Sequence, residues 1–103
     1  QNPTALAIDS SNNLYIADST KCVVRVVTRS TGNISVFAGT PGSCGYSGDG
    51  FPPTSATIGA VQGMAFDSSG NFFLADSTSC VIRLIPSTGM YITTFAGVNG
   101  VCT

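Results

Sequence analysis

The chain has 103 residues, of which four are basic and five acidic, and its formal net charge at pH 7 is −1. So small a charge provides no electrostatic footprint for nucleic acid or for an anionic membrane surface. The chain contains no histidine and no glutamate, which excludes a Ser-His-Asp triad, a paired-glutamate site and a His-ligated metal. We therefore expect no catalytic residues, no metal and no cofactor.

A chain this poor in charge must owe its solubility to its 13 Ser and 12 Thr residues, to turn backbone or to attached glycans. No apolar run approaches the ~18 residues that a membrane span needs, and Gln1 does not begin a signal peptide, so we expect a mature or excised segment. The four cysteines are too widely spread for an all-cysteine zinc site. They predict disulfides and hence an extracellular, oxidising compartment.

Four short β-rich runs come first, at residues 5–8, 14–17, 23–27 and 34–38. Clusters of Asp, Ser, Asn, Thr and Gly separate the runs, and these residues close β-hairpins because they cap their own backbone or tolerate positive φ. The pattern predicts a four-stranded antiparallel meander without helix. Ser35 interrupts the apolar side chains of the fourth run, as is typical of an outer, half-exposed strand.

Residues 39–60 lack periodicity and are predicted to form a long connection whose start is pinned by Cys44. The single carboxylate of the Gly45 to Gly50 segment, Asp49, falls short of the several oxygen donors of a calcium loop. No Gly-Lys-Ser/Thr is present to close a phosphate-binding loop. We expect a connection here rather than a ligand site.

The rest of the chain repeats the first part: Asp9 recurs as Asp67, and this offset of 58 residues then holds. One residue is lost after Arg83 and regained near Met90, where a turn absorbs the change. Residues 3–38 and 61–96 are therefore predicted to form two superposable four-stranded antiparallel sheets. The matched segments are Ala17-Asp18-Ser19-Thr20 with Ala75-Asp76-Ser77-Thr78, Cys22-Val23 with Cys80-Val81, Arg25 with Arg83, Phe37-Ala38-Gly39 with Phe95-Ala96-Gly97, and Cys44 with Cys102.

The chain resembles an NHL repeat in the run from Ala5 to Ser19, Ala-Leu-Ala-Ile-Asp-Ser-Ser-Asn-Asn-Leu-Tyr-Ile-Ala-Asp-Ser, and in the Val-Arg-Val-Val and Phe-Ala-Gly that follow. Residues 45–56 resemble the linkers between such repeats. The resemblance implies that each copy is one blade of a β-propeller, commonly six-bladed, whose loops meet protein, peptide, glycan or RNA partners. The expected fold is all-β, with two four-stranded antiparallel propeller-type blades, residues 1–58 with the long linker and residues 59–103.

Two blades cannot close a ring, and their outer faces and strand edges need cover. We therefore expect the chain to be part of a larger propeller or repeat assembly, with neighbouring NHL-like blades or copies of itself as partners and protein or glycan as further ligands. Within the chain, the two sheets should pack face to face. The expected core includes Leu6, Ile8, Ile16 and Val24 of the first sheet and Met64, Phe66 and Leu74 of the second.

Four cysteines allow three pairings, which sequence alone does not separate. The expected strand geometry favours Cys22 with Cys44 and Cys80 with Cys102, because one cysteine begins a third strand and the other follows the fourth strand beside it. The rival pairing of Cys22 with Cys80 and of Cys44 with Cys102 would have to span two sheets about 10 Å apart.

Asp18 and Asp76 are the first candidates for a cation site, because carboxylates at equivalent blade positions can converge on a propeller axis. The favoured alternative is that each caps a turn through its own backbone, and the same holds for Asp9 and Asp67.

Arg25 and Arg83 lie among Val and Leu, where a guanidinium bonds neighbouring carbonyls or pairs with an aspartate, so structural roles are favoured for both. Asn33-Ile34-Ser35 is an N-glycosylation sequon at a turn, and Asn33 is a candidate glycan acceptor on a secreted protein.

Three functions remain. The first is an extracellular, non-catalytic NHL-like interaction scaffold. The second is a structural subunit of a self-assembling fibre whose Ser- and Thr-rich surface carries glycans. The third is a fragment of a propeller enzyme, because some NHL-like propellers are lyases with metal-binding histidines; the absence of histidine makes this the weakest of the three.

Overall fold

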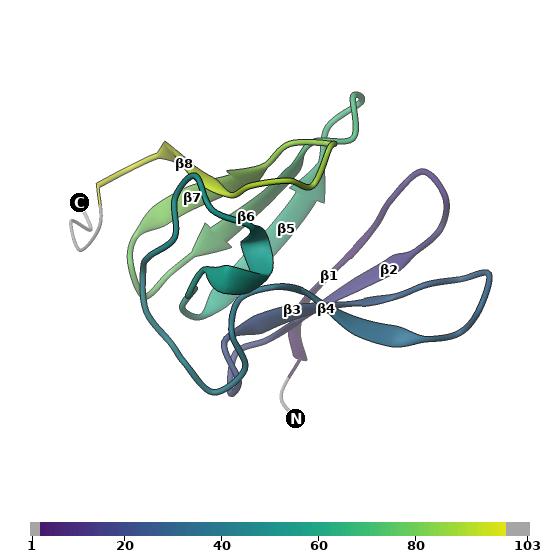
Figure 1. The fold of residues 1–103 in the computed structure, drawn as a ribbon, viewed down its shortest axis with the longest axis horizontal. Coiled ribbons are helices and arrows are strands. Elements are labelled where there is room, and N and C mark those ends of the chain that lie inside the picture. The colour runs from purple at the N-terminus through teal and green to yellow at the C-terminus, as the bar shows by residue number, and fades with distance from the viewer. Residues whose placement is uncertain (1–2, 99–103) are drawn as a thin grey trace.

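The computed structural model describes residues 3–98, and in this part the chain forms two four-stranded antiparallel β-sheets and no α-helix (Figure 1). The first sheet contains β1 (Pro3–Ile8), β2 (Leu14–Asp18), β3 (Val23–Val27) and β4 (Ile34–Ala38). The second contains β5 (Val61–Phe66), β6 (Phe72–Asp76), β7 (Val81–Ile85) and β8 (Thr93–Ala96). A short 3-10 helix, η1 (Pro53–Ser55), lies in the connection. The all-β prediction and both meanders are confirmed, and no helix in the described part could cross a membrane.

The two sheets share one pairing register. Leu6 lies opposite Ile16 in the first sheet, and Met64 lies opposite Leu74 in the second. Each sheet also has a register shift near the start of its first strand and another beside the arginine of its third strand. Equivalent positions of the two sheets, 58 residues apart, can therefore be compared directly.

The Phe-Ala-Gly motif at the end of each fourth strand has a steric reason. Gly39 has a φ of 90°, and a Cβ atom there would lie 2.6 Å from the carbonyl oxygen of Cys22. Gly97 has a φ of 93°, and its Cβ would lie 2.7 Å from the carbonyl oxygen of Cys80. Only glycine lets the end of the fourth strand pass this close to the start of the third.

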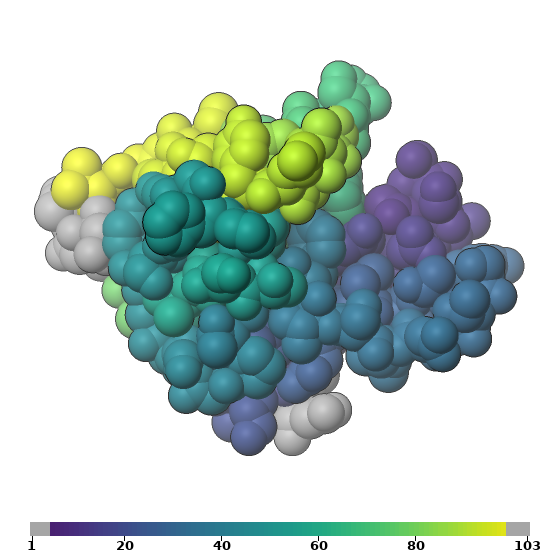
Figure 2. All heavy atoms as spheres, in the orientation of Figure 1, coloured from purple at the N-terminus to yellow at the C-terminus, as the bar shows by residue number. Residues whose placement is uncertain are grey.

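The sheets touch along their inner strands, β1 and β5, and the connection of residues 39–60 lies between their outer strands (Figure 1). In the space-filling view the teal spheres of this connection form a continuous surface with the yellow-green strand β8 (Figure 2). The connection also contributes to the core through Ala56 and Ile58. The whole buried cluster consists of Tyr15, Ala17, Val24 and Ala38 of the first sheet, Ala56 and Ile58 of the connection, and Val61, Phe72, Leu74, Ile85 and Ile92.

The connection is tied to both sheets. Cys44 forms a disulfide with Cys22 of the first sheet, with 5.2 Å between the Cα atoms. Farther along, the backbone N–H of Gly50 donates to the carbonyl of Ile92 at 2.6 Å, and the N–H of Ile92 donates to the carbonyl of Phe51 at 3.0 Å. The long aperiodic stretch is thus an ordered layer against the second sheet.

The predicted core is wrong at Leu6 and Ile8, whose exposed fractions are 63% and 60%. Side chains alternate between the faces of a strand, and on β1 the small Ala5 and Ala7 face the core instead. We attribute this to the close approach of β1 and β5, which leaves little room for large side chains on both strands. Val24 is fully buried, as predicted. Ile16 is only half-buried, whereas Leu74 is buried and Met64 and Phe66 pack against the core.

Candidate functional site

The face of the first sheet that points away from the second sheet is apolar and largely uncovered. The pairing register places Leu6, Ile16, Arg25 and Val36 in one row across its four strands. Leu6 is 63% exposed, and so is Ile34, near the start of β4. Apolar surface of this kind on a sheet normally has a partner. We call this face, centred on Arg25, the outer face.

The equivalent face of the second sheet is covered. Its corresponding row is Met64, Leu74, Arg83 and Thr94. Leu74 is 1% exposed and Arg83 is 0% exposed. The same surface therefore occurs twice in the chain, once exposed and once covered by the first sheet and the connection.

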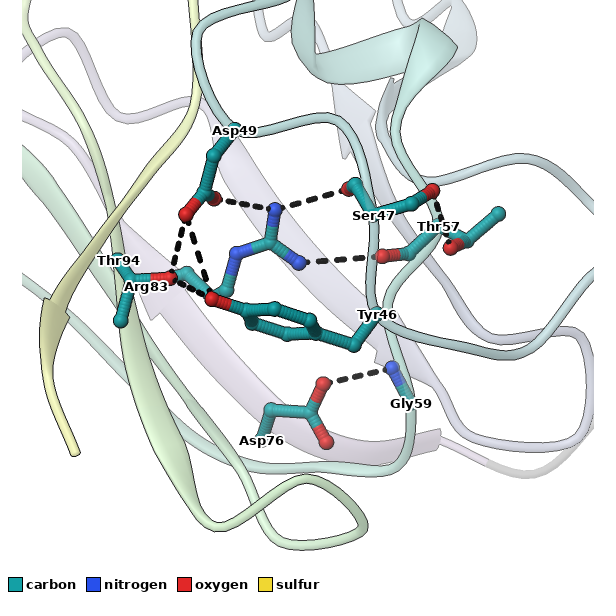
Figure 3. A network of polar contacts seen from close by, with 8 residues as sticks. All are labelled: Tyr46, Ser47, Asp49, Thr57, Gly59, Asp76, Arg83 and Thr94. Atoms are coloured by element: carbon teal, nitrogen blue, oxygen red, sulfur yellow. Dashed lines mark hydrogen bonds and ion pairs between the residues drawn. The ribbon is translucent and has the colours of Figure 1, made fainter. Parts of the chain in front are cut away.

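Arg83 is held by a network that the connection supplies (Figure 3). Its Nη1 donates to the carbonyl of Thr57 at 3.1 Å, and its Nη2 donates to the carbonyl of Ser47 at 3.0 Å. Nη2 also forms an ion pair with the Asp49 carboxylate at 2.8 Å. The ring of Tyr46 lies against the guanidinium, with the Cζ atom of Arg83 4.7 Å from the ring centroid. Such a buried, multiply bonded guanidinium fastens two segments together.

The other oxygen of Asp49 is held in the same network. Thr94 Oγ1 donates to Asp49 Oδ2 at 2.7 Å, and the Tyr46 hydroxyl donates to it at 3.3 Å. The sequence predicted a carbonyl or aspartate partner for Arg83, and the structure provides both. It did not identify Asp49 or Tyr46, which are separated from Arg83 by more than 30 residues and lie in a segment without periodicity.

Arg25 has different surroundings, although it is the equivalent residue. The Nε atom of each of these two arginines is buried without a hydrogen-bond partner among the described residues, but within residues 3–98 no hydrogen bond or ion pair joins the Arg25 guanidinium to a carbonyl or an aspartate. The predicted carbonyl or aspartate partner of Arg25 is therefore not found in the described part of the chain. Arg25 is the one charged side chain in its row on the outer face.

The four carboxylates outside the connection serve as turn caps. Asp18 Oδ1 accepts the N–H groups of Thr20 and Lys21 at 3.1 and 3.3 Å, while its buried Oδ2 has no partner among the described residues. Asp76 accepts the N–H of Ser79 at 3.1 Å with Oδ1 and that of Gly59 at 2.8 Å with Oδ2. No group of three or more potential metal ligands occurs in residues 3–98.

A cleft of about 240 Å³ opens between the first hairpin turns of the two sheets. Its floor is an aromatic cluster in which the rings of Tyr15 and Phe66 lie 4.9 Å apart, and those of Phe37 and Phe72 lie 5.2 Å apart. The volume is below the ~300–1,000 Å³ of typical small-molecule pockets. The cleft is therefore a weaker candidate for a site than the outer face.

Asp9, Tyr15 and Asp67 are ionisable groups that line this cleft, and the first two interact with each other. Burial works to raise the pKa of Asp9, but hydrogen bonds from Asn13, Tyr15 and Ser11 outweigh it and lower the pKa below its ordinary value. Burial, followed by the hydrogen bond and the charge of Asp9, raises the pKa of Tyr15 to about 12. The two groups stabilise a turn, because the Tyr15 hydroxyl donates to Asp9 Oδ2 at 3.1 Å.

The remaining predicted site residues are the cysteines and Asn33. The Cys22–Cys44 disulfide is present and excludes the rival pairing for these two residues. Cys102 lies outside the described residues, so its pairing with Cys80 stays a prediction; Cys80 has a φ of 61°, close to the 59° of Cys22. Asn33 is exposed in the turn before β4, and its glycosylation stays a prediction.

No protein-family model and no curated protein matches the chain. Among solved structures, the chain is similar to a protein of unknown function from Bacteroides thetaiotaomicron VPI-5482, with a TM-score of 0.78 and 24% identity. The match covers 89% of this chain and 22% of that protein. The likeness shows the fold of paired four-stranded sheets as part of a larger chain.

Proposed function

We propose that the chain is a non-catalytic interaction module of NHL-like propeller blades that works in an extracellular compartment. One observation carries the proposal. The outer face of the first sheet exposes large apolar side chains, whereas the equivalent face of the second sheet is covered. The Cys22–Cys44 disulfide supports an oxidising compartment. The structural partners of Asp9, Asp18, Asp67 and Asp76 support a role without catalysis, because these carboxylates are engaged in turns.

Particle shape and mass test this proposal. The disulfide-bonded protein is analysed by size-exclusion chromatography with light scattering and by negative-stain imaging. Discrete, disc-shaped particles are expected, and replacing Leu6 and Ile8 by aspartate should disperse them into smaller species. Monomers that also fail to bind a hydrophobic dye at the outer face would contradict the proposal.

A second candidate function, a self-assembling fibre, is favoured by the exposed face of the second sheet. A hollow of about 350 Å³ there is lined by small or apolar residues such as Ala75, Ile82 and Ala96. These are equivalent to Ala17, Val24 and Ala38, which form the face of the first sheet that meets the second. Repeating the internal contact between copies would give a head-to-tail assembly, which is an open rod when the rotation from copy to copy does not close into a ring.

Mixing two variants tests the head-to-tail contact, and negative-stain imaging of the wild-type protein distinguishes rods from discs. Leu6→Asp blocks one surface and Ile82→Asp blocks the other, so each variant alone should stay monomeric. If the rod is head-to-tail, an equimolar mixture forms 1:1 pairs through the remaining intact surfaces. A mixture that stays monomeric, with the wild-type protein forming no rods, would contradict the fibre.

A further inference from the structure

Equivalent residues of the two sheets differ in their cover, and around the arginine and the start of the fourth strand this cover is the linker segment. Ile92 is fully buried beneath the connection, whereas its equivalent Ile34 is 63% exposed. Arg83 is fully buried and paired, whereas Arg25 is half-buried and has no ion-pair or hydrogen-bond partner for its guanidinium in the described part. The second sheet thus has a covering segment that the first sheet does not have within residues 3–98.

The covering segment has a defined chemistry. It approaches the arginine with the sequence Gly-Tyr-Ser-Gly-Asp-Gly, residues 45–50. The aspartate forms the ion pair, the serine carbonyl accepts a second hydrogen bond, and the tyrosine ring covers the guanidinium. Gly48 has a φ of 91° and lies so close to Ala56 that a Cβ would come within 2.6 Å, so the segment requires glycine between Tyr46 and Asp49.

The outer face offers the same receptor without its ligand. A guanidinium among apolar side chains loses hydration, and the loss is compensated only when acceptors replace the water. Arg25 lies between Ile16 and Val36 in its row, and neither side chain can accept a hydrogen bond. An incoming carboxylate would be the complementary charge.

We propose that the outer face is the docking site for a segment of the Gly-Tyr-Ser-Gly-Asp-Gly type that belongs to another repeat unit of this kind. The aspartate of that segment pairs with Arg25, its tyrosine ring covers the guanidinium, and the residues that follow cover Ile34. This inference rests on the proposed interaction function and names the chemistry of the partner. It also assigns Arg25 as the specificity-determining residue of the surface.

The outer face differs from its covered equivalent at one position that matters for affinity. Thr94, which donates a hydrogen bond to Asp49, is replaced in the first sheet by Val36. A segment bound at Arg25 would lack that hydroxyl donor. Substituting Val36→Thr should therefore strengthen binding.

A synthetic peptide with the sequence of residues 45–58 tests the proposal when added to the intact, disulfide-bonded chain. Backbone amide NMR shifts should move saturably around Leu6, Arg25 and Val36. Because a charge-assisted hydrogen bond is at stake, Arg25→Gln should weaken binding at least about tenfold. A peptide in which the aspartate is replaced by asparagine should lose about the same factor.

Three further variants sharpen the test. Arg25→Lys should bind more weakly than wild type because an ammonium lacks the guanidinium's fork of donors. Val36→Thr should bind about threefold to tenfold more tightly. Arg29→Gln, at an exposed turn arginine, is the matched control and should leave the peptide affinity unchanged.

The outcomes separate this proposal from the proposed function. Shifts that map to the second sheet around Arg83, or binding that survives Arg25→Gln, would overturn the docking site. Absence of peptide binding, with self-association that Leu6→Asp abolishes, would assign the face to a second copy: the docking proposal would fail and the interaction function would stand. Absence of both peptide binding and self-association would overturn the docking proposal and the proposed interaction function.

Discussion

The two arginines on the third strands of this chain have identical positions and opposite surroundings. Arg83 is bonded to three partners from the connection, and Arg25 has none in the described part of the chain. In the described part of the chain the preceding linker, and not the sheet itself, bonds the two Nη atoms of the arginine, while the Nε atom has no partner in either sheet. The unit that packs as a whole is therefore a sheet together with the linker that precedes it. This unit begins earlier in the chain than the sequence repeat, which starts at the sheet.

The largest expected difference in stability concerns the residues beside the arginines. Leu74 is 1% exposed, and its equivalent Ile16 is half-buried on the outer face. Leu74→Ala should lower the free energy of unfolding by about 4 kcal/mol, since a fully buried leucine leaves a cavity. Ile16→Ala should cost about 1.5 kcal/mol, because much of that side chain is already in water. Urea unfolding of both variants checks this, and equal losses would contradict the difference in cover.

The arginines themselves give the next largest difference. Arg83→Met removes the ion pair and two hydrogen bonds to carbonyl groups, and should lower the free energy of unfolding by about 3 kcal/mol. Arg25→Met should change it by less than about 0.5 kcal/mol, because no partner is lost. Chemical denaturation at pH 7 measures both. A loss of similar size at Arg25 would indicate a partner that residues 3–98 do not contain.

The disulfide tests how firmly the linker is held to the first sheet. Replacing both Cys22 and Cys44 by serine should lower the free energy of unfolding by about 2 kcal/mol. This is the lower end of the usual range, because hydrogen bonds such as that from Gly45 to Ile58, at 3.2 Å, still hold the connection.

Non-reducing peptide mapping of the wild-type protein should also recover Cys80 linked to Cys102. A peptide that links Cys22 to Cys80 would contradict both assignments.

Local chemistry in the sequence was enough to predict the elements and their repetition. The Asp-Ser-Ser turns, the glycine after each fourth strand and the 58-residue offset led to two matching meanders, because each feature acts within a few residues of backbone. Leu6 and Ile8 were misplaced because β1 is apolar on both faces, so its alternation does not say which face is buried. The contact between Asp49 and Arg83 was not predictable, since the chain path that joins them has no periodic signal.

The smallest expected difference lies in the Asp-capped turns. Asp9 accepts a hydrogen bond from Tyr15, whereas Asp67 has no such donor, because Phe73 stands at the position equivalent to Tyr15. Tyr15→Phe should therefore cost about 0.5 to 1 kcal/mol at pH 7, the usual contribution of one hydrogen bond. Phe73→Tyr is the reciprocal variant: it places a hydroxyl at the position equivalent to Tyr15 and should raise the free energy of unfolding by a similar amount, and no gain would contradict the equivalence of the two turns.

Acid titration separates the charge of Asp9 from the packing of Tyr15. The pKa of Asp9 is lowered in the folded protein, so its ionised form stabilises the fold at pH values above the unfolded value of about 4. That contribution disappears as the pH falls below 4 and through the lowered pKa. The stability curves of wild type and Asp9→Asn, measured by urea unfolding from pH 7 to pH 2, should therefore converge at the acid end. The stability curves of wild type and Tyr15→Phe should converge only partly at low pH, because in the wild type the Tyr15 hydroxyl can still donate to the protonated carboxyl group of Asp9. Parallel curves for wild type and Asp9→Asn would show that the carboxylate charge contributes nothing to this turn.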